Sequence, residues 1–180
     1  MPPVFEIALP FLLGYLIGSI PTSYLIARWV KGIDIRQYGS GSLGGANLYR
    51  SVGGWAAVVV GLIDIAKAAL VVLAFQRLGG DLSSTVIAGL AVVLGHNWGV
   101  FLRFYGGRGI SPTMGMLLPL APTVLLANAL IALGLLVYYR SSPLPAAVAL
   151  IFLPVSSLLL GYPAPITWGC LGLVFIAFAK

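Results

Sequence analysis

The sequence predicts an all-α integral membrane protein, a bundle of seven transmembrane segments forming a single domain over residues 1–180. Of the 180 residues, 60% are hydrophobic and only 8% are charged, whereas a soluble globular domain carries about 25% charged residues. Apolar runs long enough to cross a bilayer also recur along the whole chain. So few charges cannot cover that much apolar surface, which excludes a soluble enzyme, a disordered tail and a DNA-binding domain.

Six apolar runs define the expected elements in chain order. The first is interpreted as one retained transmembrane helix, because it lacks the basic start and short apolar core of a cleaved signal peptide. The fourth permits two interpretations: one long helix, or a short piece over 112–120 followed by a full span over 122–139. The runs are Val4–Ala27, Val52–Phe75, Leu82–Leu102, Ser111–Tyr139, Pro143–Gly161 and Pro163–Ala179.

The basic residues decide between these interpretations, because membrane loops rich in Lys and Arg stay on the cytoplasmic side. The loop from Arg28 to Arg50 is strongly basic and is therefore expected inside. Pro119 and Pro122 interrupt the fourth run where a turn is needed. We predict seven segments in the cell membrane (inner or plasma membrane), with the N-terminus outside and the C-terminus and active face in the cytoplasm. Splitting the fourth run places eight of the ten basic residues on that side, at positions 28, 31, 36, 50, 103, 108, 140 and 180.

A polar, glycine-rich loop after the first span is one candidate site. Within residues 39–50 lie four glycines, two serines, an asparagine and an arginine. Glycine lets backbone N–H groups approach an anion closely, while serine and arginine supply further donors. We predict a phosphate site, with a flexible connector as the alternative. The candidate residues are Gly39, Ser40, Gly41, Ser42, Gly44, Asn47 and Arg50.

A second cluster follows the third span. His96, the only histidine in the chain, precedes a loop in which Gly106, Gly107 and Gly109 surround Arg108. A lone histidine in an apolar helix is commonly a packed residue, but ionisable groups in membrane segments are costly and face the bundle interior. Neither loop matches a P-loop or a dinucleotide fingerprint. Two basic, glycine-rich loops and a histidine on one membrane face favour a small phosphorylated ligand.

The remaining charged residues have simpler expected roles. Asp64 and Lys67 are three residues apart on one helical face, so we expect an internal ion pair. Asp34 and Arg36 are either loop caps or ligand contacts. The sequence has no set of Cys, His and carboxylate residues suited to a metal, so we expect no metal and no cofactor.

Taken in order, these motifs resemble the bacterial acyl-phosphate:glycerol-3-phosphate acyltransferase family, the PlsY type. The resemblance is strongest between Gly18 and Gly109. It consists of Gly18-Ser19-Ile20-Pro21, Asp34-Ile35-Arg36, Gly39-Ser40-Gly41, Asn47 with Arg50, Asp64 with Lys67, Gly95-His96, and Gly106-Gly107-Arg108-Gly109.

The resemblance implies transfer of a fatty acyl group from acyl phosphate to the 1-hydroxyl of glycerol 3-phosphate, giving lysophosphatidic acid and phosphate. Its implied catalytic residues are Ser40, Arg50, His96 and Arg108, which would contact the phosphorylated substrates. The 106–109 loop would cradle a phosphate, and the acyl chain would lie between helices. Acyl phosphate is already activated, so no protein nucleophile is required, and a substrate phosphate oxygen is a candidate acceptor for the hydroxyl proton.

Several positions differ from the family's usual residues. Tyr105 and Arg108 stand where the family has lysines, and Ser42 stands where it has asparagine. The family also commonly has a His-Arg-Glu-Asn segment after the last helix, where this sequence reads Ala179-Lys180. The alternative function is a catalytically weak homologue that binds lipid phosphates or is the partner of an active acyltransferase. A transporter or channel is disfavoured, because the spans carry few polar residues that could line a pathway.

Overall fold

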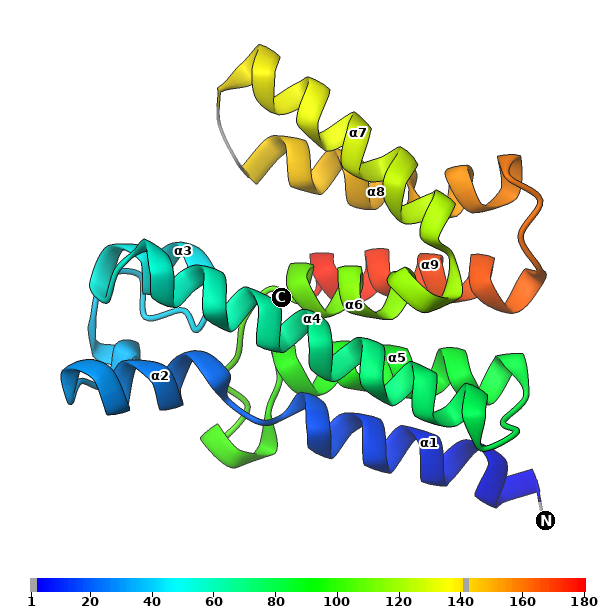
Figure 1. Ribbon diagram of the computed structural model, residues 1–180, viewed down its shortest axis with the longest axis horizontal. Coiled ribbons are helices and arrows are strands. Elements are labelled where there is room, and N and C mark those ends of the chain that lie inside the picture. The colour runs from blue at the N-terminus through cyan, green and yellow to red at the C-terminus, as the bar shows by residue number, and fades with distance from the viewer. Residues whose placement is uncertain (1–2, 141–142) are drawn as a thin grey trace.

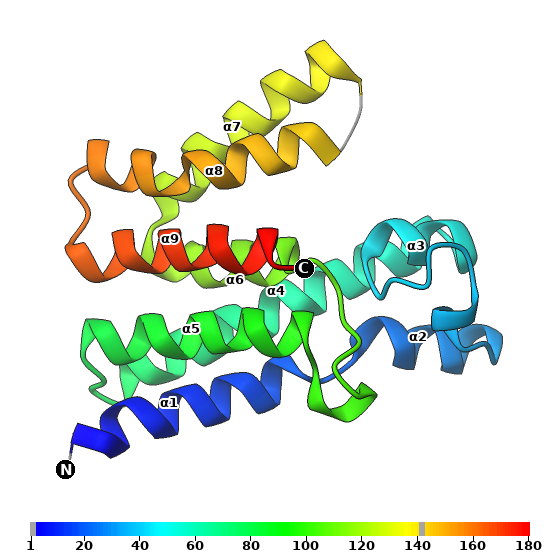
Figure 2. The ribbon, with the colours of Figure 1, turned by 180° about the vertical axis from the view of Figure 1, so that it is seen from behind.

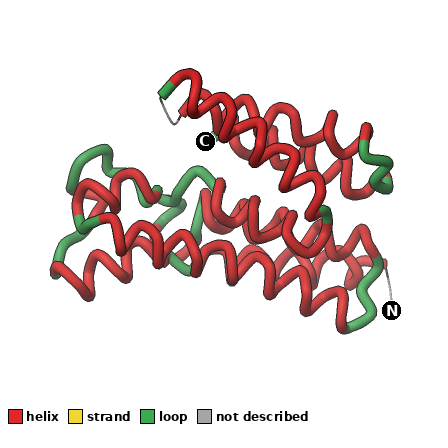
Figure 3. Tube along the Cα trace, turned by 45° about the horizontal axis from the view of Figure 1, so that its top comes forward, coloured by secondary structure: helices red, strands yellow, loops and turns green. Residues whose placement is uncertain are grey.

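The computed structural model describes residues 3–140 and 143–180, and every regular element among them is helical (Figure 3). Nine α-helices and two short 3₁₀ helices follow one another in this part of the chain. They are α1 (Pro3–Gly18), α2 (Thr22–Lys31), η1 (Ile35–Gln37), α3 (Gly45–Ser51), α4 (Gly54–Arg77), α5 (Leu82–Asn97), η2 (Val100–Leu102), α6 (Ile110–Leu120), α7 (Pro122–Tyr139), α8 (Pro143–Leu159) and α9 (Ala164–Phe178).

Seven helical stretches correspond to the seven predicted segments. Four are long and apolar enough to cross a membrane, and α6, α8 and α9 are shorter apolar helices. The predicted division of the fourth run is confirmed: α6 ends at Leu120 and α7 begins at Pro122. Proline is well tolerated in the first turn of a helix, and this one starts α7 directly after the break.

The prediction of one continuous helix over the first apolar run is wrong. The run divides into α1 and α2, with the chain leaving helical geometry at Ser19–Pro21. Pro21 has no backbone N–H and its ring excludes the helical conformation of the preceding residue, so α2 starts afresh at Thr22. The break leaves helix-end carbonyl groups in the middle of a stretch, Ile7–Lys31, that is long enough to span a membrane.

The helices are arranged in layers (Figures 1 and 2). α1 lies at one side, the α7–α8 pair lies at the opposite side, and α4, α5, α6 and α9 lie between them. The main buried core joins these central helices to α7 and α8 through residues such as Val93, Met116, Leu153 and Leu173. α2, α3 and the end of α7 lie at one end of the bundle, and the α4–α5 connection lies at the other.

α1 and α5 are packed backbone to backbone. A side chain added at Gly14 or Gly18 of α1 would collide with the backbone of α5, and one added at Gly95 of α5 would collide with the backbone of α1. Small residues permit this close approach between membrane helices. The contact brings the end of α1 beside the end of α5, where His96 lies.

Candidate active site

Asp64 and Lys67 of α4 form the predicted internal ion pair. Lys67 Nζ lies 2.8 Å from Asp64 Oδ1, and both side chains are less than a tenth exposed. Lys67 also donates to the carbonyl oxygens of Gly18 at 3.0 Å and Ile20 at 3.3 Å. The ammonium group therefore binds the carbonyl of Gly18, which the break leaves without an intrahelical partner at the negative end of the α1 dipole, and shares the carbonyl of Ile20 with the N–H of Thr22.

Further hydrogen bonds fix the start of α2. Thr22 Oγ1 donates to Asp64 Oδ1 at 2.9 Å, and Ser23 Oγ donates to the carbonyl of Leu43 at 2.6 Å. The first bond ties α2 to α4, and the second ties it to the 39–44 loop. The α1–α2 break thus connects the charged pair of α4 with the first glycine-rich loop.

His96 lies at the end of α5 beside this ion pair, with its side chain 12% exposed. Its Nδ1 is 3.6 Å from Asp64 Oδ1 and 3.5 Å from Lys67 Nζ. The opposite, Nε2 edge faces Gly107, where an added Cβ would collide with it. The backbone N–H of Gly107 donates to the carbonyl of His96 at 3.1 Å, which fixes the loop over the ring.

Asn47 organises the first glycine-rich loop from its interior. Its Nδ2 lies within hydrogen-bond distance of the carbonyls of Ile35 (3.3 Å), Tyr38 (3.0 Å) and Ser42 (3.0 Å), and its Oδ1 accepts from the N–H of Ser40 at 3.2 Å. The side chain is 1% exposed. This amide is predicted above to contact substrate, but its donors and acceptor are engaged with the loop backbone.

The other residues predicted from this loop differ in accessibility. Ser40 and Arg50 are exposed, whereas the Ser42 hydroxyl accepts a hydrogen bond from the N–H of Gly44 at 3.1 Å. Gly39 and Gly41 have φ values of 56° and 70°, which L-residues rarely adopt. The loop therefore has a fixed backbone and presents Ser40 and Arg50 outward.

The second loop covers the end of α5. Side chains at Gly106 or Gly109 would collide with the backbone or the side chain of Asn97. Asn97 is fully buried, and neither of its amide atoms has a hydrogen-bond partner among the described residues. Arg108 is exposed, and α6 starts directly after Gly109. The free N–H groups of this helix start therefore lie beside a cation, an arrangement suited to a phosphate.

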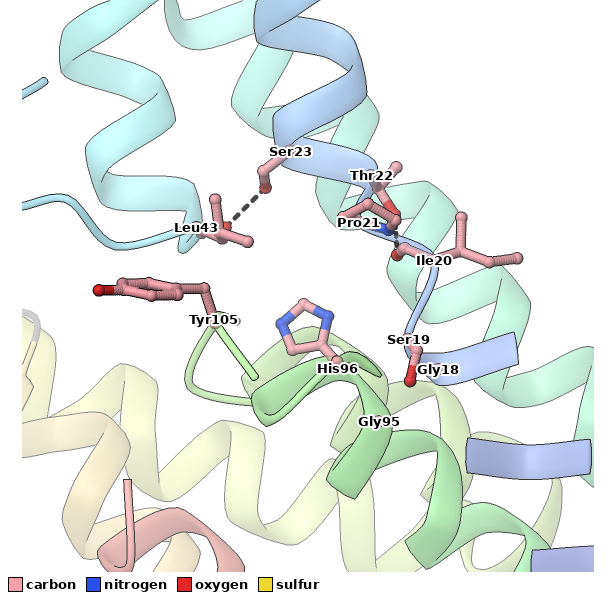
Figure 4. A pocket seen from close by; sticks show the side chains of 12 residues that line it. Gly18, Ser19, Ile20, Pro21, Thr22, Ser23, Leu43, Gly95, His96 and Tyr105 are labelled. Atoms are coloured by element: carbon pink, nitrogen blue, oxygen red, sulfur yellow. Dashed lines mark hydrogen bonds between the residues drawn. The ribbon is translucent and has the colours of Figure 1, made fainter. Parts of the chain in front are cut away.

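A small pocket joins the α1–α2 break to both loops (Figure 4). The ring of His96 stands in its centre, with Thr22 on one side and Tyr105 and Leu43 on the other. Of the predicted site residues, His96 and Gly107 line it, whereas Ser40, Arg50 and Arg108 do not. The lining residues from the break and the first turn of α2 are not among the predicted site residues, although a proline with Ser and Thr close by inside an apolar run is a visible signal. Those residues are Ser19, Ile20, Pro21, Thr22 and Ser23.

Asp34 and Arg36 pair with each other at the start of η1. Arg36 NH2 lies 2.6 Å from Asp34 Oδ2, and Asp34 also accepts from the N–H of Arg36, so it caps η1. The hydrogen bonds from the Arg36 side chain hold the pKa of Asp34 below its usual value. The Arg36 guanidinium lies over the rings of Tyr24 and Tyr105. Of the two predicted roles, the described contacts support the cap.

An apolar groove of about 350 Å³ lies between α6, α7 and α8. It begins at Ile110, the first residue of α6 after the second loop, and follows α7 from Leu136 to Leu125. At 1.5 Å per residue this stretch of α7 is about 16 Å long. The groove is therefore large enough to hold a hydrocarbon chain and starts next to the Gly109 turn.

Comparison with known proteins identifies this arrangement. Residues 8–180 match the sequence pattern of the family described as glycerol-3-phosphate acyltransferase. The chain belongs to the glycerol-3-phosphate acyltransferase family. A relative from Dehalococcoides mccartyi (strain CBDB1), named glycerol-3-phosphate acyltransferase 4, is 38% identical over all of this chain and 79% of its own length. One from Synechococcus sp. (strain CC9902) is 45% identical over 83% of this chain and 74% of its own.

Solved structures give the same family. The chain is similar to the crystal structure of PlsY (YgiH), an integral membrane glycerol 3-phosphate acyltransferase, in its glycerol 3-phosphate form. The TM-score is 0.88 at 30% identity, with 96% of this chain and 86% of the other covered. The lysophosphatidic acid form of PlsY gives a TM-score of 0.86 at 29% identity over the same shares. These matches establish a membrane acyltransferase fold and do not favour the weak-homologue alternative.

Proposed function

We propose that the protein transfers a fatty acyl group from acyl phosphate to the 1-hydroxyl of glycerol 3-phosphate, at the cytoplasmic face of the membrane. The products are lysophosphatidic acid and inorganic phosphate. The observation that carries the proposal is the convergence of both glycine-rich loops on His96, beside an apolar groove. A phosphorylated acceptor and an acyl donor need these two environments next to each other.

We assign the exposed side chains of the two glycine-rich loops and the N-terminus of α6 to the binding of the substrates' phosphate groups. Arg50 and Ser40 of the first loop bind one phosphate, and Arg108 with the backbone N–H groups of residues 106, 108 and 109 binds the other. The acyl chain lies in the α6–α7–α8 groove, whose entrance at Ile110 follows directly after the second loop. This arrangement aligns the activated acyl phosphate with the acceptor hydroxyl, so the barrier falls through positioning and charge neutralisation.

The cytoplasmic location is supported by the positions of the basic residues. α2 and α3, which carry Arg28, Lys31 and Arg50, lie at the same end of the bundle as the end of α7, where Arg140 lies (Figure 1). Basic loops favour the cytoplasm. An Arg140→Cys variant should react with a membrane-impermeant thiol reagent only after the cells are opened, since Cys170 is buried. Labelling in intact cells would contradict this topology.

The direct test is an acyl-transfer assay on purified protein in lipid or detergent. Palmitoyl phosphate and labelled glycerol 3-phosphate are supplied, and lysophosphatidic acid is measured. Wild-type protein should form product, and Ser40→Ala and Arg50→Ala should each abolish turnover while leaving the melting temperature unchanged. Absence of product from folded wild-type protein would overturn the proposed reaction. Wild-type rates in both variants would overturn the assignment of the first loop.

A further inference from the structure

The buried Asp64–Lys67 pair on α4 contacts several residues that line the pocket. Asp64, Lys67 and Thr22 form a connected cluster, and the imidazole of His96 lies against it through Nδ1. Charged groups in a membrane segment are costly. An ion pair whose only role is to neutralise two charges needs no particular neighbour, whereas this pair lies against the imidazole ring at the centre of the pocket.

The two contacts of Nδ1 require opposite positions of the ring proton. A contact with Lys67 Nζ, at 3.5 Å, needs a lone pair on Nδ1, because an ammonium group only donates. A contact with Asp64 Oδ1, at 3.6 Å, needs a proton on Nδ1, because a carboxylate only accepts. The distances are too similar to decide between these cases.

The donor count of Lys67 decides between them. Its ammonium group has three N–H bonds, and three oxygens lie closer than His96: Asp64 Oδ1 at 2.8 Å, Gly18 O at 3.0 Å and Ile20 O at 3.3 Å. No N–H remains for Nδ1. Lys67 and Thr22 both donate to Oδ1 of Asp64, so the Nδ1 proton of His96 is a third and longer contact with that oxygen, on a carboxylate whose two oxygens together offer about four lone-pair sites.

We propose that Asp64 and Lys67 are positioning residues that fix His96 as the Nδ1–H tautomer, which leaves the Nε2 lone pair facing Gly107 and the substrates. Lys67 holds the Asp64 carboxylate and the α1–α2 break in place. Asp64 accepts the Nδ1 proton in a contact that is longer than a formed hydrogen bond, as such contacts commonly are before substrate binds. Nε2 then accepts the hydrogen bond of the acceptor hydroxyl and orients its oxygen.

This inference extends the proposed function, and its primary test does not depend on activity. Because His96 is the only histidine, protein labelled with ¹⁵N-histidine gives the ring signals of one site. Long-range ¹H–¹⁵N correlation spectra distinguish the Nδ1–H tautomer, the Nε2–H tautomer and the imidazolium ion. The neutral ring of free histidine prefers the Nε2–H tautomer, whereas we expect the Nδ1–H tautomer for His96.

The wild-type protein without substrate should show the Nδ1–H tautomer. Asp64→Asn should shift the ring toward Nε2–H, and kcat/KM should fall about ten-fold or more, the loss of roughly one hydrogen bond in the transition state. Asp81→Asn is the matched control, since Asp81 caps α5 at its other end and Asn is a comparable cap. It should leave tautomer and rate unchanged.

Two results would overturn the inference. One is an Nε2–H tautomer in the wild-type protein, and the other is an unchanged Nδ1–H tautomer in Asp64→Asn. If Asp64→Asn does not fold, Thr22→Val takes its place. This variant removes the Thr22 hydroxyl, which donates to Asp64 at 2.9 Å and lies 3.4 Å from the carbonyl of Ile20. With the carboxylate less firmly held, the Nε2–H fraction should increase, and an unchanged spectrum would count against the inference. A missing acyl-transfer activity with an Nδ1–H ring would contradict the proposed function alone.

Discussion

The guanidinium of Arg36 lies 5.9 Å from the ring centroid of Tyr105. Arg36 belongs to η1, which precedes the first glycine-rich loop, and Tyr105 belongs to the second. The family resemblance implies a lysine at position 105, so this chain has an aromatic ring where a second cation would stand. The contact joins η1, directly before the first loop, to the second loop by a cation–π interaction of about 0.5–1 kcal/mol.

This contact predicts different effects for two substitutions of Tyr105. Tyr105→Phe keeps the ring over Arg36 and should retain kcat/KM within about two-fold. Tyr105→Leu removes the ring and should lower kcat/KM several-fold, because a loss of about 1 kcal/mol corresponds to roughly five-fold. Steady-state kinetics with varied glycerol 3-phosphate measures both. Equal rates in the two variants would show that the loops are held by other contacts.

The Asp34–Arg36 pair predicts a pH dependence of stability. Hydrogen bonds from Arg36 lower the pKa of Asp34 in the folded protein. The pair therefore stabilises the fold above the unfolded pKa of about 3.9 and loses this contribution as pH falls through the lower folded value. Asp34→Asn should be less stable than wild type at pH 7, and the difference in melting temperature should shrink as the pH falls below about 4 and disappear once the pH is below the lowered pKa. A constant difference across this range would contradict the role of the carboxylate.

The contacts of Asn47 predict that its removal lowers stability and activity together. Asn47→Ala removes the partner of several buried loop groups and should cost about 1–3 kcal/mol of unfolding free energy. Thermal unfolding in detergent measures this loss, and activity should fall with it. Ser40→Ala changes an exposed side chain, so it is the control in which a substrate contact is lost without a loss of stability. An unchanged melting temperature in Asn47→Ala would return this residue to the list of substrate contacts.

The close approach of Gly107 to His96 predicts a large effect from one methyl group. Gly107→Ala would drive the new Cβ into the Nε2 edge of the ring, so it should displace the loop or the imidazole. We expect a loss of at least about ten-fold in kcat/KM, because displaced catalytic geometry has effects of this size or more. Gly134→Ala on α7, where nothing lies within 4 Å of the new Cβ, is the matched control and should retain full activity.

The α6–α7–α8 groove predicts a change in acyl-chain preference. Ala129 lines the groove on α7, so Ala129→Phe should shorten the space available to the chain. Turnover of long-chain acyl phosphates should fall relative to short-chain ones, as measured by competition between donors of different length. Ala74→Phe, at an exposed position of α4 outside the groove, controls for added bulk on a lipid-facing surface. An unchanged preference in Ala129→Phe would place the chain elsewhere.

Local sequence patterns predicted the parts of the fold that depend on neighbours in the chain. The division at Leu120–Pro122 follows from two prolines and from charge placement. The Asp64–Lys67 pair follows from a spacing of one helical turn. In both cases the residues responsible are close in sequence, so a local pattern is enough to predict the structure.

The missed features depend on contacts between distant segments. The break at Ser19–Pro21 leaves the carbonyl of Gly18 to be satisfied by Lys67, 49 residues further along the chain. The loop of Asn47 turns its amide inward, and residue type does not reveal whether an amide faces a ligand or a backbone. The bond from Ser23 to Leu43, which joins the break to the first loop, also gives no local signal.

The glycine contact between α1 and α5 also has a mechanical consequence. With no side chains between the two backbones, neither helix can slide or tilt without a direct collision. The end of α1 and His96 therefore form one rigid support beneath the pocket. The carbonyl of Gly18, which binds Lys67, and the imidazole of His96 therefore keep a fixed position relative to each other.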